Sequence, residues 1–421
     1  MSYAALDRTT LAKLVPELLL SGQLIDRSGM AHCIAAFGRE TMAQIAIEEW
    51  MAASPVYTKR MRTALQIDGD GVADMFKCLQ LDIGAPPQFM DFRYTIYDEY
   101  HGEFVLNHCG ALMDVEPMGD DYVTSMCHDI EDPTFDATAI ATNRRARIRP
   151  IHRPPRRPEG QHPHCAWTVT IEPDRDELPL PPESIIMSGT RAAQAELSTI
   201  EPGGDGHDDY LGPVWEDLKF EDWSHSALVR IAEEVALQHQ LLALGFLMSV
   251  RGKTDEDGAI EIFRKQLTGI SGLTADRLRQ SLGLDRGAED LATVLRLHPI
   301  LGPVQYTGVQ VETAGSGDEA IVRVRLPRSS DAVADDGWLA HLDPDHLEPV
   351  LAMATAVELS WSAVSGYADG DDLVIEISHG TPLEKELGEV AIARFSGGAT
   401  FEFEDRGRGI PLSITPVTAG T

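Results

Sequence analysis

The chain has few cysteines and few basic residues, and each shortage limits what the protein can be. Only 5 cysteines occur among 421 residues, an odd number that does not indicate a disulfide framework. Lys and Arg total 35 against 67 Asp and Glu, and the net charge of −32 disfavours nucleic acid and anionic membranes as partners. No apolar run approaches the roughly 20 residues that cross a bilayer, so we expect no membrane partner.

The N-terminus lacks a basic region followed by an apolar stretch and a cleavage site, so we expect a cytoplasmic protein with reduced thiols. Hydrophobic residues make up 43% of the chain and charged residues 24%, which are ordinary values for a folded globular protein. At roughly 100 to 200 residues per domain, the length accommodates two or three domains.

The residue patterns predict two parts that each combine helices and strands. Apolar residues at three-and-four spacing predict helices over 11–20 and 30–51, and alternation predicts strands within 92–106 and 167–171. A segment rich in Pro, Gly and acidic residues follows. After it, a helix is expected over 223–250, strands over 320–326 and 373–377, and a hairpin turn at Gly397-Gly398 between 392–395 and 400–403.

Two segments of the first part resemble two segments of the second. Residues 60–68 (RMRTALQID) match 277–285 (RLRQSLGLD), and 74–81 match 290–297. We therefore predict an α+β fold with two related lobes, each with helices packed on an antiparallel sheet, that arose by internal duplication. The expected boundaries are a first lobe at 1–175, a linker at 176–220 and a second lobe at 221–421. A chance match between amphipathic helices is the alternative.

All five cysteines lie in the first lobe, and three of them stand beside histidines, in His108-Cys109, Cys127-His128-Asp129 and His164-Cys165. Thiolate and imidazole are ligands that zinc prefers and that iron accepts. We predict a transition-metal site from Cys109, Cys127 and Cys165, completed by His128 or His164. The spacing matches no metal-binding signature, and buried thiols that pack as small apolar groups are the alternative.

A second local feature is a cluster of seven arginines and no acids between Arg144 and Arg157. A guanidinium group presents two parallel donors to a carboxylate or phosphate, so Arg144, Arg145 and Arg147 are candidate substrate-binding residues. Nearby prolines equally fit an exposed loop whose arginines pair with the protein's own acidic surface.

The helical first part, then Cys109, then Cys127-His-Asp-Ile-Glu131, then His164-Cys165 before a strand, resembles the L-2-amino-thiazoline-4-carboxylic acid hydrolase-like family. That family is itself similar to the small-molecule-binding domains named after vinyl reductase. The resemblance covers roughly residues 30–172 and implies a cysteine-lined pocket on an α+β scaffold.

Together these features predict a metal-dependent or cysteine-dependent enzyme that acts on a small molecule, such as a hydrolase of a C–N or C–S bond. With a metal, Glu103, Asp129 or Glu131 is the candidate general base. Without one, Cys127 would attack the substrate and a neighbouring histidine would move the proton. The alternatives are a small-molecule sensor whose second lobe carries the contacts of a homodimer, and a structural metal scaffold.

Overall fold

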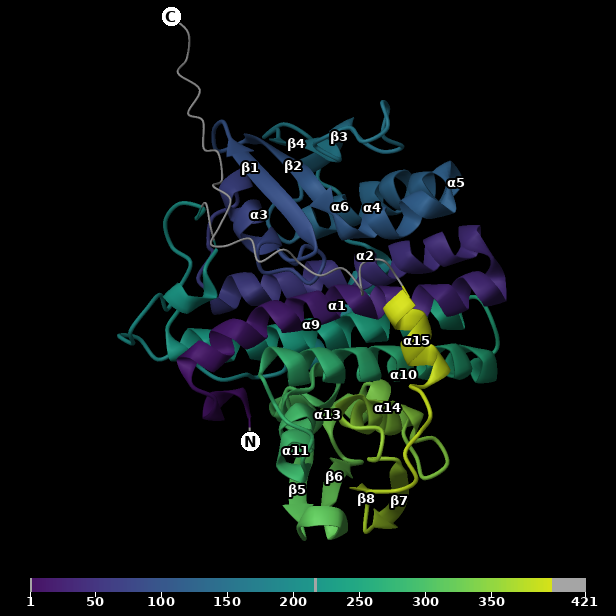
Figure 1. Ribbon diagram of the computed structural model, residues 1–421. Helices are drawn as coiled ribbons and strands as arrows, with labels where there is room; N and C mark the ends of the chain where they lie inside the picture. The colour runs from purple at the N-terminus through teal and green to yellow at the C-terminus, as the bar shows by residue number, and fades with distance from the viewer. Residues whose placement is uncertain (1, 216–217, 396–421) are drawn as a thin grey trace, which may run out of the picture.

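In the computed structural model, which describes residues 2–215 and 218–395, a layer of four long helices separates two antiparallel sheets (Figure 1). The long helices are α1 (Arg8–Phe37), α2 (Arg39–Ala64), α9 (His225–Arg251) and α10 (Glu256–Ser281). Asp7 begins α1 by accepting a hydrogen bond from the Thr10 N–H at 2.9 Å, and Gly38, at φ 82°, ends it. The predicted α+β fold with two lobes is confirmed.

The first sheet has the strand order β1-β2-β4-β3 and belongs to the first lobe. Its strands are β1 (Met90–Ile96), β2 (His101–Cys109), β3 (Ala146–His152) and β4 (Cys165–Ile171). The shorter helices of this lobe are α3 (Val72–Leu79), α4 (Gly110–Val115), α5 (Asp120–Thr124) and α6 (Glu131–Ile140). A π-helical turn, η3 (Ser125–Ile130), joins α5 to α6, and short 3-10 turns lie at η1 (Tyr3–Ala5) and η2 (Glu116–Met118).

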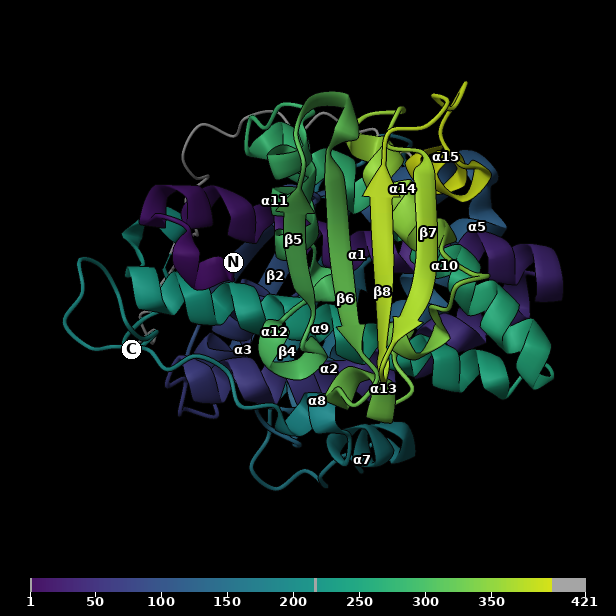
Figure 2. The ribbon, with the colours of Figure 1, turned by 90° about the horizontal axis from the view of Figure 1, so that it is seen from below.

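The second sheet repeats the same order, β5-β6-β8-β7, and faces the viewer in Figure 2. Its strands are β5 (Gln310–Ala314), β6 (Ile321–Pro327), β7 (Ala363–Asp369) and β8 (Asp372–Ser378). The other helices of this lobe are α11 (Ala288–Leu297), α12 (Val304–Thr307), α13 (Asp331–Ala334), α14 (Glu348–Val357) and α15 (Gly388–Phe395). Its 3-10 turns are η4 (Phe220–Asp222), η5 (Pro299–Leu301), η6 (Gly317–Glu319) and η7 (Trp338–His341).

The matched sequence segments occupy matching places in the two lobes. Arg60 lies near the end of α2 and Arg277 near the end of α10, while the second pair of segments forms α3 and α11. Arg60 pairs with Glu234 of α9 at 2.9 Å, and Arg277 pairs with Glu17 of α1 at 2.8 Å. Glu17 and Glu234 are separated along the chain by the same number of residues as the two arginines, so the two ion pairs are equivalent.

The long helices pack mainly against those of the other lobe, α2 against α9 and α1 against α10. Because α1 lies between α9 and α10, its buried residues surround the helix and include the polar Ser21, Gln23 and Asp26. The core is therefore continuous across both lobes. In the described residues, no helix is both long and apolar enough to span a membrane.

Two segments differ from expectation. Residues 176–220, expected to be a linker, contain α7 (Pro182–Ser188) and α8 (Arg191–Gln194), which pack on α2 and α9. The hairpin expected around Gly397-Gly398 is wrong in its first strand, because residues 392–395 end helix α15, whose Val390 and Ala393 are buried. The rest of that expected hairpin lies outside the described residues.

Candidate functional site

The three cysteines predicted as ligands do converge, and they do so around Glu131. Cys109 ends β2, Cys165 begins β4, and Cys127 lies in the π-helical turn; all three are buried. Burial raises the pKa of each thiol, to about 12 for Cys109, and the nearby Glu131 carboxyl raises all three further. Protonated thiols are weak nucleophiles and weak metal ligands, so this environment does not favour Cys127 as an attacking group.

The two predicted histidine ligands are held elsewhere. The Nε2 of His128 hydrogen-bonds the Pro154 carbonyl oxygen at 2.7 Å. His164 packs beside His108 and His162, with ring centroids 5.7 and 4.9 Å away, and burial together with Arg156 lowers its pKa to about 4. In residues 2–215 and 218–395, no three Cys, His, Asp or Glu side chains are arranged to hold a metal ion. The zinc or iron site stays a prediction from the sequence.

Two of the three candidate bases lie away from this centre. Asp129 is exposed on the π-helical turn. Glu103 alternates with the buried Phe104 along β2, so its side chain lies on the opposite face of the sheet from the core. Glu131 alone, at the first position of α6, lies among the thiols, and one of its carboxyl oxygens is buried without a partner in the described part of the chain.

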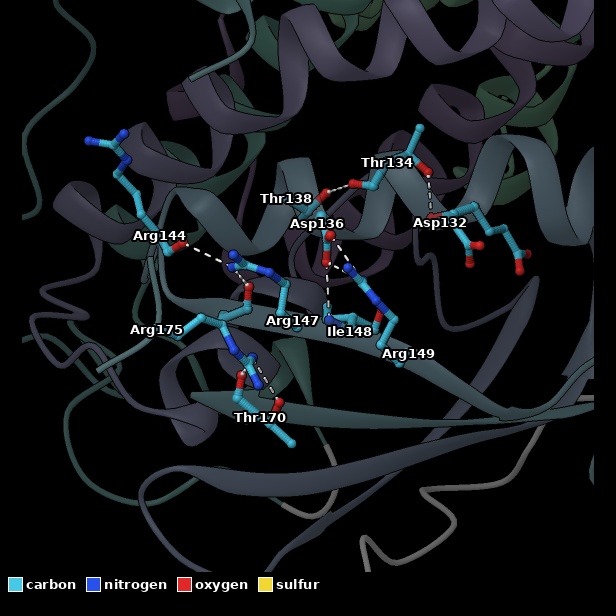
Figure 3. A network of polar contacts seen from close by, with 12 residues as sticks. Asp132, Thr134, Asp136, Thr138, Arg144, Arg147, Ile148, Arg149, Thr170 and Arg175 are labelled. Atoms are coloured by element: carbon cyan, nitrogen blue, oxygen red, sulfur yellow. Dashed lines mark hydrogen bonds and ion pairs between the residues drawn. The ribbon is translucent and has the colours of Figure 1, made fainter. Parts of the chain in front are cut away.

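The arginine cluster is engaged with the protein itself. Arg144 donates to the Leu178 carbonyl at 2.8 Å and Arg145 to Glu177 at 2.6 Å, while Arg147 donates to the carbonyl groups of Ala146 and Asp176. Figure 3 shows Arg149 on β3 directed at Asp136 of α6, with both contacts at 2.9 Å. These contacts engage only part of each guanidinium group, and the Arg145 Nε has no partner in the described residues, so the substrate-binding role of the first three arginines stays a prediction.

The remaining arginines of the cluster fasten the long β3–β4 loop over the π-helical turn. Arg156 holds Glu116 at 2.8 and 2.6 Å, and Arg153 holds Asp132 at 2.5 Å. In the second lobe, β7 and β8 are joined by a short turn at Gly370 instead. The added loop of the first lobe therefore braces the segment that carries Cys127 and Glu131.

A cavity of about 90 Å³ lies on the helix side of Glu131, between α1, α2 and the first sheet. Its wall includes three carboxyl groups, one phenol and one amide, set among apolar side chains such as Leu79, Phe92, Leu106 and Phe135. These groups belong to Gln23, Asp26, Tyr57, Asp82 and Glu131, and the wall also contains Thr134 and Thr138. Such a wall, apolar with a few convergent polar groups, is typical of small-molecule sites.

The carboxyl groups of this cavity are protonated more readily than usual. Burial raises the pKa of Glu131 to about 8 and that of Asp82 to about 6, although Asp82 accepts hydrogen bonds from the Tyr57 O–H at 2.8 Å and the Gly84 N–H at 2.7 Å. Burial likewise raises the pKa of Asp26, and burial together with Asp26 raises that of Glu49 well above its usual range.

Several polar atoms at the cavity have no hydrogen-bond partner in the described residues. They are one oxygen each of Gln23, Asp26 and Glu131; Glu49, which lies outside the cavity wall, also has both carboxyl oxygens without a partner. Each buried polar group left without a partner costs about 1–3 kcal/mol, so such a concentration needs an explanation other than stability.

The sequence analysis found Glu131 but missed Asp26, Glu49 and Asp82, because single carboxylates inside long helices or after them form no motif. The second lobe supplies the signal that was overlooked. When the two lobes are aligned so that Arg60 matches Arg277, Asp26 matches Ala243 and Glu49 matches Gln266. In the second pair of matched segments, Asp82 corresponds to His298, the residue after α11.

The equivalent place in the second lobe is filled by internal hydrogen bonds. Gln240, which corresponds to Gln23, donates to the carbonyl groups of Pro299, Ile300 and Gly302 at 3.0, 2.9 and 2.9 Å. His298 bonds the Ser271 carbonyl at 3.0 Å. The acidic cavity is therefore a property of the first lobe and not of the shared fold.

Comparison of the chain with protein-family models, with curated proteins and with solved structures gives no match. The resemblance to the thiazoline-carboxylate hydrolase-like family thus stays a prediction, and the site must be interpreted from its own chemistry.

Proposed function

We propose that the first lobe is an enzyme that performs acid–base chemistry on a small molecule whose reacting group enters the acidic cavity. One observation carries this proposal: three buried carboxyl groups line the cavity, two of them with an unsatisfied oxygen, while the second lobe has Ala243 in place of Asp26 and His298 in place of Asp82. Perturbed carboxyl groups lining one cavity are typical of catalytic sites.

Asp82 and Glu131 fit complementary roles. With a pKa of about 6, Asp82 is ionised at neutral pH and can accept a proton, and the Tyr57 hydroxyl that donates to it holds its carboxylate in place. With a pKa of about 8, Glu131 is mostly protonated at neutral pH and can give one. Two carboxyl groups whose environments separate their pKa values are a recurring acid–base pair, and hydrolysis of a C–N or C–S bond is one reaction they could serve.

In this proposal the thiol groups of Cys109, Cys127 and Cys165 do not attack the substrate. They surround Glu131 with buried, apolar thiols that keep water from its carboxyl group and hold its pKa high. The second lobe completes the helix layer on which the cavity is built, through α9 packed against α2.

The test is turnover of a small-molecule extract by the full chain, followed by mass spectrometry. We expect a compound that the protein consumes, with the rate rising through about pH 6 and falling above about pH 8. Asp82→Asn should lower the rate by about 100-fold or more. Glu348→Gln is the control for loss of a carboxylate outside the cavity. Glu348 is the first residue of α14, as Glu131 is of α6, but its side chain is exposed.

Equal consumption by the protein and by Asp82→Asn would contradict the proposal. Retention of a compound without conversion, lost in Asp82→Asn, would instead support the small-molecule sensor that the sequence also allows. Circular dichroism of each variant shows whether its fold is intact before its rate is interpreted.

A further inference from the structure

A second and larger cleft lies on the other side of α2, beneath α7. Its volume is about 610 Å³, which falls in the range of small-molecule sites. The apolar part of its wall comes from Pro55, Val56, Ile140, Leu180 and Ile185. Leu180 and Ile185 keep 43% and 57% of their surfaces exposed, so part of this apolar wall is open to a ligand.

The charged residues of this cleft are mostly basic, in a chain whose net charge is −32. Arg60 and Arg230 both pair with Glu234, each at 2.9 Å, and Glu234 is the one carboxylate in the wall. Lys59 adds another positive charge, and its ammonium group has no ion-pair or hydrogen-bond partner within residues 2–215 and 218–395. The cleft therefore has an excess of positive charge and one cation free to bind an anion.

In the second lobe the corresponding place is closed by α15. Backbone and side chains of α15 approach α10 at Gly269 and Gly272, where an added Cβ would lie 2.9 Å from the Glu389 carbonyl oxygen and 2.6 Å from Val390. Arg394 of α15 then pairs with Asp276 of α10 at 3.0 Å. The elements α7 and α15 thus cover equivalent helices, and the cleft lies beside α7.

The two lobes have opposite charges at the key position. Asp276, which takes a cation from α15, corresponds to Lys59, since each directly precedes one of the paired arginines Arg277 and Arg60. No acid of α7 pairs with Lys59 in the described structure. In the second lobe, a cation of the apolar helix α15 binds the acid Asp276. At the first-lobe cleft the corresponding residue is the cation Lys59, so the matching group would be an anion attached to an apolar body.

We propose that this cleft binds a small molecule with an apolar body and a carboxylate, with the carboxylate on Lys59 and the body against Val56, Leu180 and Ile185. The site is separate from the acidic cavity and does not depend on the acid–base function. An anion fits here and a cation does not, because three positive groups face one carboxylate that is already paired.

The experiment is calorimetric titration of the full chain with decanoate and, separately, with decylamine, both below their micelle concentrations. We expect one decanoate per chain and much weaker binding of decylamine. Lys59→Glu should weaken decanoate binding by about ten-fold, and Ile185→Asp should weaken it as well. Lys13→Glu, the same charge change at an exposed residue of α1 outside the cleft wall, should leave it unchanged.

Both substituted cleft residues are exposed, so thermal melting should confirm that these variants stay folded. The proposal is overturned if decanoate does not bind, if decylamine binds equally, or if Lys59→Glu binds decanoate as the unaltered protein does. It is also overturned if sedimentation shows dimers that Ile185→Asp dissociates, because a second copy would then be the occupant of this surface.

Discussion

Asp82 lies three residues after the end of α3 and His298 directly follows α11, at corresponding places in two lobes of the same topology. The side chains of His298 and Gln240 hydrogen-bond backbone carbonyl groups and so fill the interior of the second lobe. Asp82 and Gln23 line a cavity in the first. This difference separates residues that the shared fold requires from residues that only one lobe has. One lobe alone would not allow the two kinds of residue to be told apart.

The same comparison applies at the outer face of the helix layer. α15 fits tightly onto two glycines of α10, whereas α7 stands over Pro55 and Val56 and leaves a cleft. In both places the second lobe is closed by contacts within the chain and the first is open. Predictions that contrast equivalent residues can therefore test the functional assignments without knowledge of the substrate.

The largest contrast is expected between the equivalent glutamines. Gln240→Ala removes a buried amide that donates to three carbonyl groups and leaves a void, so it should lower the free energy of unfolding by about 3 kcal/mol. Gln23→Ala removes an amide whose oxygen has no partner in the described residues and should cost under about 1 kcal/mol. Urea unfolding followed by circular dichroism measures both, and equal losses would refute the distinction between a closed and an open interior.

A smaller contrast is expected between the equivalent ion pairs. Arg60→Ala should cost about 2 kcal/mol, because the Glu234 side chain is 2% exposed and the guanidinium group also caps the Ala193 and Ala195 carbonyls. Arg277→Ala should cost about 1 kcal/mol, because the Glu17 side chain is 17% exposed and water can solvate it. A larger loss for Arg277→Ala in thermal unfolding would contradict this ranking.

The last contrast concerns the pH dependence of stability. Because folding raises the Glu131 pKa from 4.5 to about 8, the folded state holds this proton more tightly than the unfolded state. Raising the pH from about 4.5 to about 8 therefore costs stability through this group, a loss that Glu131→Gln should remove. The variant should melt several degrees higher than the unaltered protein at pH 8 and no higher at pH 4. The exposed Glu348→Gln should show no such dependence, and a variant advantage that does not change with pH would argue against a raised pKa.

Much of the fold could be predicted because its signals are local. Alternation over 167–171 marked β4, and the repeated Arg-x-Arg segments marked equivalent ends of α2 and α10. The convergence of Cys109, Cys127 and Cys165 was also expected, although their protonated state was not, since it depends on burial around Glu131. The expected metal site, homodimer and hydrolase activity are not tested by the structure.

The acidic cavity could not be predicted from local pattern. Asp26 lies in a helix buried on all sides between α9 and α10, so no polar stripe distinguishes it from a solvated residue. The π-helical turn that carries Cys127 packs against α2 and α6, and no short sequence window records these contacts. Extending the sequence match between the lobes to α1 and α9 aligns Asp26 with Ala243. This difference between the lobes is the signal in the sequence that points to the cavity.

The crossing of α1 onto α10 and of α2 onto α9 also bears on how the protein arose. The long helices of each half are covered by those of the other half, so one half alone would expose its apolar helix faces to water. An ancestor encoding a single repeat would have needed a twin chain to complete the layer. Fusion of two such genes would then have freed one half to specialise while the other kept the pair together.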